Sequence, residues 1–266
     1  MLYLSLFTKS IEVQRMETGK TVVSKSQEQQ YCDEGFFILD KVLPDRNLEI
    51  LRSECGDLIR AQEQEMDRQK TDVLNLSRRN SRYFVFLAYK DRPRLGDFIF
   101  SDLMAEICRA TIGDSAMLFW EQFVVKGTDR VGADFPWHQD SGYVDRAHRP
   151  YVNCWIPLDD VTEENGTVYI LPFSKAGTRE RVEHKPIPNS NDRVGYFGKE
   201  TGVPVVVPAG SIAVFSSVSF HRSGANSTKQ MRRAYSIQYS PDVVLDSDGS
   251  LKGLAEPFLQ NGRRVR

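Results

Sequence analysis

The sequence contains little cysteine and little histidine, and neither sign of charge is in excess. Four cysteines and four histidines occur in 266 residues, and 35 basic side chains nearly balance 36 acidic ones. The cysteines lie far apart, without the paired spacing of a zinc knuckle or the density of a disulfide framework, so we expect reduced thiols that serve packing. Balanced charge gives no electrostatic argument for nucleic acid or an anionic membrane as the main partner, and favours a small-molecule substrate. The four cysteines are Cys32, Cys55, Cys108 and Cys154.

Long hydrophobic runs are also missing. Residues 1–7 are apolar but too short for a spanning helix, and they lack the basic region and small-residue cleavage site of a secretory signal. We therefore expect no membrane segment and a cytoplasmic protein. Residues 1–25 are predicted to be a flexible extension and residues 26–266 a single domain, and the sequence predicts no particular oligomeric state.

The domain changes character near its middle. Residues 26–115 have helical periodicity, with helices expected over Leu43–Ile59 and Phe98–Ile112 and a stop at Gly113. Residues 116–241 carry short β-rich runs separated by turn residues, and residues 242–266 form a tail. This alternation of short β-rich runs and turn residues predicts a mainly β protein, an antiparallel barrel or jelly roll with helices packed on it. The expected strands are Leu118–Val125, Tyr151–Leu158, Thr167–Leu171, Val203–Val207, Ser211–Ser216 and Arg233–Tyr239.

Two polar segments are candidate lids over a site. Residues 63–82 are densely charged with little apolar periodicity, which predicts a helix end followed by a loop. Residues 174–202 are long, polar and loop-like, and long loops in a compact domain are often functional.

A metal site is indicated by His138, Asp140 and His221. In an extended segment residues i and i+2 point to one face, so His138 and Asp140 can address one ion. His-x-Asp alone is weak evidence, but His221 follows a predicted apolar strand and supplies a second imidazole. Two imidazoles and one carboxylate leave open positions on a non-haem iron, whereas a hydrolytic zinc site usually closes more of its coordination sphere.

An anion-binding arginine is expected shortly after this histidine. Arg232 follows His221 through a turn-rich connection, so a return strand can bring its planar guanidinium beside the metal to bind a carboxylate. Arg233 competes with it. Arg232 shares strand parity with small and polar residues, which suits a barrel interior, whereas Arg233 shares parity with Tyr235 and Ile237. A solvent-facing Arg232 stays open as the alternative.

Together these residues resemble the phytanoyl-CoA dioxygenase superfamily of Fe(II)/2-oxoglutarate oxygenases. The resemblance covers roughly residues 118–239. The ordered set that carries it consists of Trp137-His138-Gln139-Asp140, Asn153-Cys154-Trp155-Ile156-Pro157-Leu158-Asp159-Asp160, Glu163-Glu164-Asn165-Gly166-Thr167, and His221-Arg222-Ser223-Gly224-Ala225-Asn226 followed by Arg232.

The resemblance implies a double-stranded β-helix that uses Fe(II), 2-oxoglutarate and O2. It assigns the iron to His138, Asp140 and His221, and the 2-oxoglutarate to Arg232. By the same similarity, further residues are candidates for the 2-oxoglutarate site, and a plain turn role remains the alternative for Ser223. These candidates are Gln139, Trp155, Ser223 and Gln122, with Lys126 on the same strand as Gln122.

The expected reaction is hydroxylation of a C–H bond with release of succinate and CO2. Ring formation, desaturation or epimerisation are alternatives on the same scaffold, as are a metal enzyme that does not use 2-oxoglutarate and a non-catalytic binding protein. Residues 172–175 read Pro-Phe-Ser-Lys where many relatives carry Pro-Gly-Ser-His. This altered loop favours a specialised pocket and a substrate from secondary metabolism, although a free amino acid or an acyl thioester also fits.

For several other polar residues the sequence favours a place outside the site or leaves the choice open. His148 and His184 lie among charged residues, which predicts solvated surface positions. The arginines of residues 78–82 are expected to form a solvated face rather than a substrate contact. Tyr143 can either overhang the metal or pack in the core.

Overall fold

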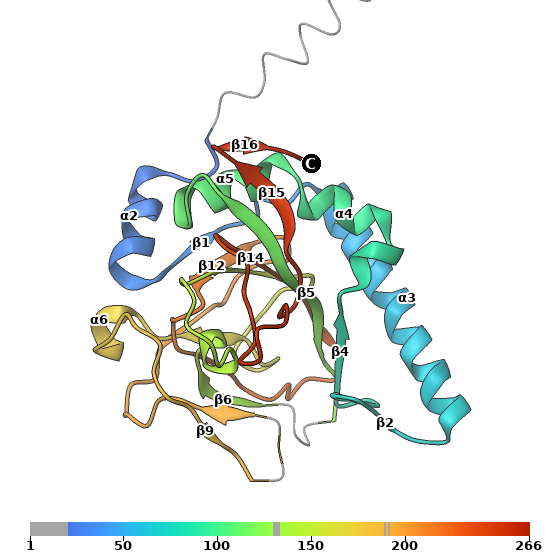
Figure 1. Cartoon of the computed structure of the whole chain (residues 1–266). Helices are drawn as coiled ribbons and strands as arrows, with labels where there is room; N and C mark the ends of the chain where they lie inside the picture. Colours follow the sequence, from blue (N-terminus) through green and yellow to red (C-terminus); the bar gives the residue numbers. More distant parts are fainter. Residues whose placement is uncertain (1–20, 130–133, 189, 191) are drawn as a thin grey trace, which may run out of the picture.

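The computed structural model of the chain describes residues 21–129, 134–188, 190 and 192–266 (Figure 1). Most of the predicted N-terminal extension lies outside these residues, and the first described helix, α2, begins at Lys25. No helix in the described ranges is long and apolar enough to cross a membrane.

All described helices except the short α6 lie in the first half of the chain, as predicted, but their bounds differ. One helix runs to Gln69, past the expected end at Ile59, because Met66 continues its buried face. The helix expected over residues 98–112 is two helices, since Ser101 caps a new one by accepting a hydrogen bond from the Met104 backbone N–H. The helices are α2 (Lys25–Glu34), α3 (Asp45–Gln69), α4 (Pro93–Ile99), α5 (Asp102–Thr111) and α6 (Phe173–Ala176), with 3-10 turns η1 (Ala88–Asp91) and η2 (Asp140–Tyr143).

The described strands form two large antiparallel sheets, one of ten strands and one of four, and a separate two-stranded sheet. The large sheet has the order β1 (Phe36–Leu39), β12 (Ile212–Ser216), β7 (Val152–Pro157), β14 (Arg232–Ser240), β5 (Ala116–Lys126), β4 (Arg82–Phe86), β3 (Ser77–Arg78) and β2 (Val73–Leu74), with β15 (Glu256–Gln260) paired to β5 and β16 (Arg263–Arg264) paired to β15. The small sheet has the order β11 (Val203–Pro204), β8 (Val168–Ile170), β13 (His221–Ser223) and β6 (Phe135–His138), and β9 (Lys185–Pro186) pairs with β10 (Arg193–Val194).

The first lid candidate is part of this framework. Residues 63–69 continue α3, and β2, β3 and β4 then add strands to the edge of the large sheet. Arg79 holds the connection by ion pairs to Asp67 and Asp72, at 2.6 and 2.8 Å. The prediction of a loop after the helix was wrong, because the charged residues that follow Gln69 form short paired strands and ion pairs.

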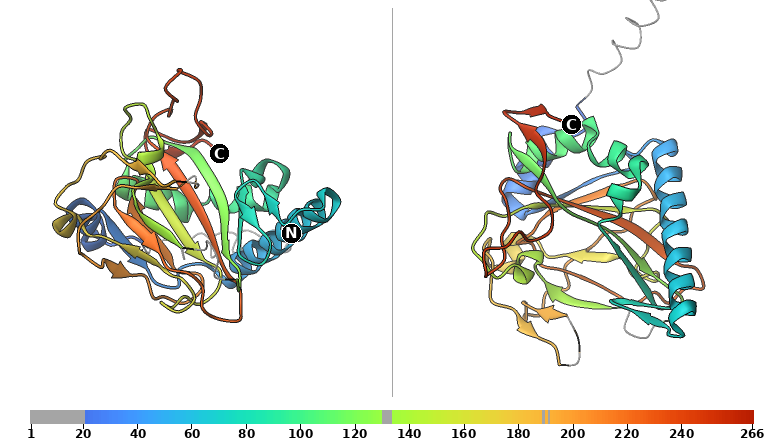
Figure 2. Two further views of the ribbon diagram at one scale, coloured as in Figure 1. Left: turned by 90° about the horizontal axis from the view of Figure 1, so that it is seen from below. Right: turned by 45° about the vertical axis from the view of Figure 1, so that its right-hand side comes forward.

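Helices cover the outer face of the large sheet, and the inner face meets the small sheet. The right-hand view of Figure 2 shows α3 running along the large sheet. The outer core joins helix residues such as Leu51 and Ile99 to strand residues such as Tyr235 and Ile237. A smaller inner core joins Trp155 of the large sheet to other apolar side chains of both sheets. The predicted jelly roll, a double-stranded β-helix with helices packed on it, is confirmed.

Strand parity follows from this layering. Side chains alternate along β14, so Arg232 and Ala234 point between the sheets while Arg233 and Tyr235 point toward the helices. Arg233 donates to the Asp159 carboxylate through both Nε and Nη2, at 3.0 and 2.6 Å. The two adjacent arginines therefore have separate environments, and the expected inward position of Arg232 is the one observed.

Candidate metal centre

His138, Asp140 and His221 meet at one end of the space between the sheets. His138 ends β6 and His221 begins β13, and the register of these neighbouring strands places the two histidines opposite each other. Their ligand atoms and an Asp140 oxygen all lie within 4.8 Å of one another. Asp140 Oδ1 is 3.7 Å from His138 Nε2 and 3.5 Å from His221 Nε2. One ion can bridge atoms at these separations.

Backbone carbonyls set the tautomer of both imidazoles. His138 Nδ1 lies 2.8 Å from the Pro136 carbonyl oxygen, and His221 Nδ1 lies 3.2 Å from that of Ser219. Because a carbonyl oxygen only accepts, each Nδ1 carries the proton and each Nε2 presents its lone pair to the shared centre. Burial, reinforced by the neighbouring His221, lowers the pKa of His138 to about 4. A neutral imidazole is the form that binds a metal.

A glutamine from the large sheet orients the carboxylate. Gln238 Nε2 donates to Asp140 Oδ2 at 3.1 Å, so Oδ1 is the oxygen that faces both imidazoles. Gln238 was not predicted as a site residue. The sequence could have indicated its inward position, since Gln238 has the same strand parity on β14 as Arg232.

The opposite end of the space between the sheets is cationic. Arg232 is only 1% exposed, and its guanidinium donates to the Gly166 carbonyl at 3.0 Å and the Val124 carbonyl at 3.4 Å. Its Nε has no hydrogen-bond partner within the described ranges. Burial lowers the pKa of Arg232 to about 10, so the group remains charged at neutral pH. The nearby Asp159 carboxylate is bound by Arg233 instead.

Lys126 lies beside this arginine. The β5–β14 register pairs Lys126 with Arg232, and Lys126 is likewise 1% exposed. Its ammonium donates to the Gly224 carbonyl and lies 5.5 Å from the centre of the Phe135 ring. Burial, reinforced by the Arg232 charge, lowers the pKa of Lys126 to about 6. Two buried basic side chains, Arg232 and Lys126, are therefore adjacent, and an anionic ligand such as a carboxylate could bind to both.

A cavity of about 110 Å³ lies between the metal cluster and the cationic end. His138, Asp140 and His221 line it, and three of the residues predicted for the cosubstrate line it too: Trp155, Ser223 and Gln122. Arg232 lies behind its wall, with the guanidinium 5.5 Å from the Trp155 ring centre. The structure therefore brings together the predicted metal, arginine and lining residues.

Gln139, also predicted to line the cosubstrate site, faces the other way. It lies between two residues that share a face, so strand alternation directs its side chain away from the metal. Its Nε2 donates to the carbonyls of Val218 at 2.7 Å and Glu180 at 2.9 Å, and its Oε1 accepts from the Val182 N–H at 2.9 Å. Gln139 is a fully buried anchor for the second lid candidate, which corrects the prediction.

His184, expected on the surface, is partly buried and completes this anchor. Its Nε2 accepts from the Gln139 backbone N–H at 2.8 Å, and its Nδ1 donates to the Val182 carbonyl at 2.9 Å. Gly142 and Gly195 lie against the ring, where an added Cβ would come within 2.4 and 2.5 Å of ring atoms. The second lid candidate is therefore attached directly behind the metal-binding strand.

The remaining predictions for polar residues had mixed outcomes. His148 is partly buried rather than solvated, and its Nε2 lies 3.0 Å from Ser141 Oγ. Tyr143 makes a T-shaped contact with His138, with the ring centres 5.7 Å apart, and lines a second cavity. Arg82 lines that cavity as well, whereas Arg79 is engaged by ion pairs as expected of a surface residue.

Comparison with known proteins gives one family and several similar structures. The family described as phytanoyl-CoA dioxygenase (PhyH) matches residues 31–234. A "Probable phytanoyl-CoA dioxygenase" of Caenorhabditis elegans is 20% identical over 239 residues, which is 84% of this chain and 77% of that protein.

Two solved structures extend the likeness to the fold. The carbocyclase SnoK from nogalamycin biosynthesis has a TM-score of 0.65 at 17% identity, covering 90% of this chain and 95% of that chain. EvdO2 from Micromonospora carbonacea var. aurantiaca has a TM-score of 0.62 at 22% identity, covering 88% and 94%. At these identities the likeness establishes a shared fold.

Proposed function

Because the chain belongs to the phytanoyl-CoA dioxygenase family, we propose that it oxidises a C–H bond of a small organic molecule, with hydroxylation as the default outcome. It is a non-haem oxygenase that depends on Fe(II) and 2-oxoglutarate and consumes O2. In the proposed reaction one oxygen atom of O2 enters the substrate and the other enters succinate, and CO2 leaves. A natural-product intermediate is the proposed kind of substrate, in line with the SnoK-like fold.

We assign the iron to His138, Asp140 and His221. Their donors are two imidazole Nε2 atoms and one carboxylate oxygen, which is the set that leaves iron positions open for a chelating keto acid and O2. The carbonyl partners of both Nδ1 atoms and the Gln238 bond to Asp140 fix these donors before the metal binds. This bracing fits the geometry that an iron site needs.

We assign the distal carboxylate of 2-oxoglutarate to Arg232 and Lys126. Among the residues that the structure describes, the buried Nε of Arg232 has no hydrogen-bond partner, and a carboxylate would supply the acceptor that this atom lacks. Lys126 sits beside it in the β5–β14 register and adds a second donor. Trp155, Ser223 and Gln122 line the space through which the keto acid would reach the metal.

Iron and 2-oxoglutarate held by these residues would supply the oxidant for the substrate. The protein's own residues hold the reactants and exclude water. Phe135 and Trp155 provide apolar surface beside the ligands, and the anchored segment around His184 closes the site from behind. The buried Arg232 supports this assignment most strongly, because a charged side chain this deeply buried calls for an anionic partner.

Anaerobic titration tests the assignment. Fe(II) and 2-oxoglutarate added together should give the weak visible charge-transfer absorption of the chelate, which neither gives alone. Iron that binds to the wild-type protein without producing this band would contradict the cosubstrate assignment. Succinate released in the presence of a substrate panel, compared with oxidised product, then separates coupled oxidation from idle turnover.

A further inference from the structure

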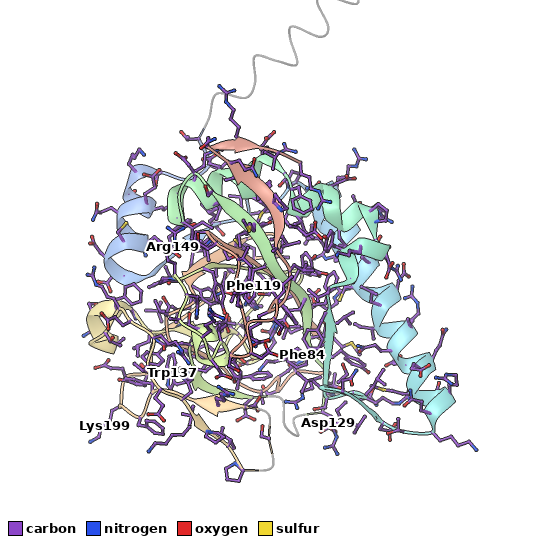
Figure 3. The ribbon with its side chains drawn as sticks, viewed as in Figure 1. Phe84, Phe119, Asp129, Trp137, Arg149 and Lys199 are labelled. Carbon is purple, nitrogen blue, oxygen red and sulfur yellow. The ribbon has the colours of Figure 1, made fainter. Side chains whose placement is uncertain are left out.

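A second, larger cavity adjoins the metal cluster. It measures about 390 Å³ and is lined by His138 and Asp140, so it opens onto the proposed iron site. This volume lies within the usual range for small-molecule pockets. Seven of its lining side chains are phenylalanine, tryptophan or tyrosine: Phe84, Phe86, Phe119, Trp120, Phe135, Tyr143 and Tyr151 (Figure 3, where Phe84 and Phe119 are labelled).

Four of these rings form a continuous wall. Phe135, next to the metal cluster, meets Phe84 edge-on with ring centres 5.7 Å apart. Phe84 stacks on Phe86 at 5.9 Å and 21°, because i and i+2 on β4 share a face. Phe86 then meets Trp120 of β5 at 5.7 Å. The wall therefore runs from the metal cluster outward over β4 and β5.

The ring content of this wall indicates what it binds. An aliphatic chain is held equally well by leucine, isoleucine and valine, yet the aliphatic side chains that line the described cavity are only Leu76 and Val144. Aromatic faces and edges add a directional attraction for another ring that an aliphatic guest does not receive. A wall of contacting rings is also already ordered, so little side-chain entropy is lost on binding.

The charges around the cavity are mixed in sign. Arg82 lies at the inner part of the wall, 5.9 Å from the ring centres of both Phe84 and Phe135. Asp192 contributes an acidic group, and Lys252 is held by Asp246 at 2.7 Å. Such a lining does not provide the concentrated positive charge that a polyphosphate group, as in a coenzyme A thioester, would need.

We propose that the substrate is a flat aromatic molecule that lies against the Phe84–Phe86–Trp120 wall and presents the carbon to be oxidised to the metal. This proposal rests on the proposed function, because the cavity acquires its meaning from the iron beside it. Phe86 is then a specificity-determining residue that contacts the substrate but neither the metal nor 2-oxoglutarate.

Two probes that share a carbon skeleton test the aromatic preference. Naphthalene-2-methanol and its saturated counterpart, decahydronaphthalene-2-methanol, are titrated by calorimetry into anaerobic protein loaded with Fe(II) and 2-oxoglutarate. We expect the aromatic probe to bind at least about tenfold more tightly, given the strength of ring–ring contacts. Phe86→Leu should reduce this ratio to about threefold or less. Phe197→Leu, an exchange of the same kind at an exposed ring outside the cavity, should leave the ratio unchanged.

Three results would overturn the proposal: equal affinity for the two probes, a ratio unaffected by Phe86→Leu, or tighter binding of decanoyl-CoA than of the aromatic probe. The chelate absorption is recorded in the same samples. A normal chelate absorption band together with equal affinity for the two probes would contradict an aromatic substrate and leave the proposed function intact. A missing band sinks the proposed function, while the probe ratio still reports on the cavity.

Discussion

The proposed iron end of the space between the sheets, where His138, Asp140 and His221 meet, and the cationic end at Arg232 and Lys126 hold their polar groups in opposite ways. At the iron end each ligand has its own partner: a carbonyl for His138, a carbonyl for His221, and Gln238 for Asp140. At the cationic end Arg232 reaches only backbone carbonyls, and its Nε has no partner within the described ranges. In the proposed assignment the protein thus prepares the metal site in advance, whereas an anion would complete the cationic end.

This difference implies different costs of substitution. A ligand removed from the iron end abolishes a prepared site but leaves little buried charge behind. A cation removed from the other end relieves a buried charge, and replacing such a group by an apolar side chain is often neutral or stabilising. Binding and folding stability should therefore change in opposite directions at the cationic end.

The largest effect is expected from His221→Ala. With one imidazole gone, two protein donors remain, and we expect Fe(II) affinity to fall by at least roughly 100-fold. Anaerobic calorimetry with Fe(II) measures this loss. His148→Asn is the matched control, since His148 contacts Ser141 rather than the metal cluster, and it should bind iron normally. Iron affinity retained in His221→Ala would remove this histidine from the metal site.

Next in size is Arg232→Met, compared with Arg233→Met at the adjacent position. Loss of a charge-assisted carboxylate contact should weaken 2-oxoglutarate binding about 100-fold, with iron affinity unchanged and the melting temperature of the protein without 2-oxoglutarate equal or higher. Arg233→Met breaks the pair with Asp159, so it should lower the melting temperature and spare 2-oxoglutarate. The reverse pattern would exchange the roles of the two arginines.

Lys126 should make 2-oxoglutarate binding depend on pH. With a pKa of about 6, the Lys126 amine is neutral at pH 8 in the protein without 2-oxoglutarate, and the incoming dianion should restore its proton. Calorimetry in buffers of different ionisation enthalpy should show uptake of about one proton per 2-oxoglutarate bound, and affinity that falls as pH rises. Lys126→Met should abolish the uptake and weaken binding roughly 30-fold, as expected for a lost hydrogen bond to a charged group.

The lowered pKa of Lys126 also determines whether the free energy of unfolding rises or falls with pH. The unfolded chain keeps this lysine protonated up to its ordinary pKa of 10.5, whereas the folded chain releases the proton near 6. The unfolded state therefore binds more protons between these values, and the free energy of unfolding should rise with pH across that window. Lys126→Met should flatten this part of the stability profile measured without 2-oxoglutarate. An unchanged slope would mean that Lys126 keeps its proton.

Local pattern predicted most of the site. His138 and Asp140 share a face because strand side chains alternate, and the same alternation separated Arg232 from Arg233. It could also have excluded Gln139, which falls between two residues of the metal face. That position was assigned by family resemblance instead, and the observed bonds to residues 180, 182 and 218 show why parity is the better guide there.

Features that depend on distant contacts were not predictable in this way. The ring of His184 fits between Gly142 and Gly195, and nothing local in its charged surroundings indicates that contact. Residues 63–82 lack strand periodicity, yet β2 and β3 form because β4 offers them an edge of the sheet. The break between α4 and α5, in contrast, has a local cause, since Ser101 is a favourable helix cap.

The smallest of the expected effects, from Gln238→Leu, separates the preparation of the iron end from the ligands themselves. The substitution removes the hydrogen bond to Asp140 Oδ2 but keeps all three donors, so Fe(II) affinity should fall about tenfold rather than be lost. Gln122→Leu, also an inward-facing glutamine but without a bond to Asp140, should bind Fe(II) as the wild type does. If both variants bind iron normally, Asp140 is oriented by the metal itself. The iron end and the cationic end would then both be completed only by the ligand that binds there.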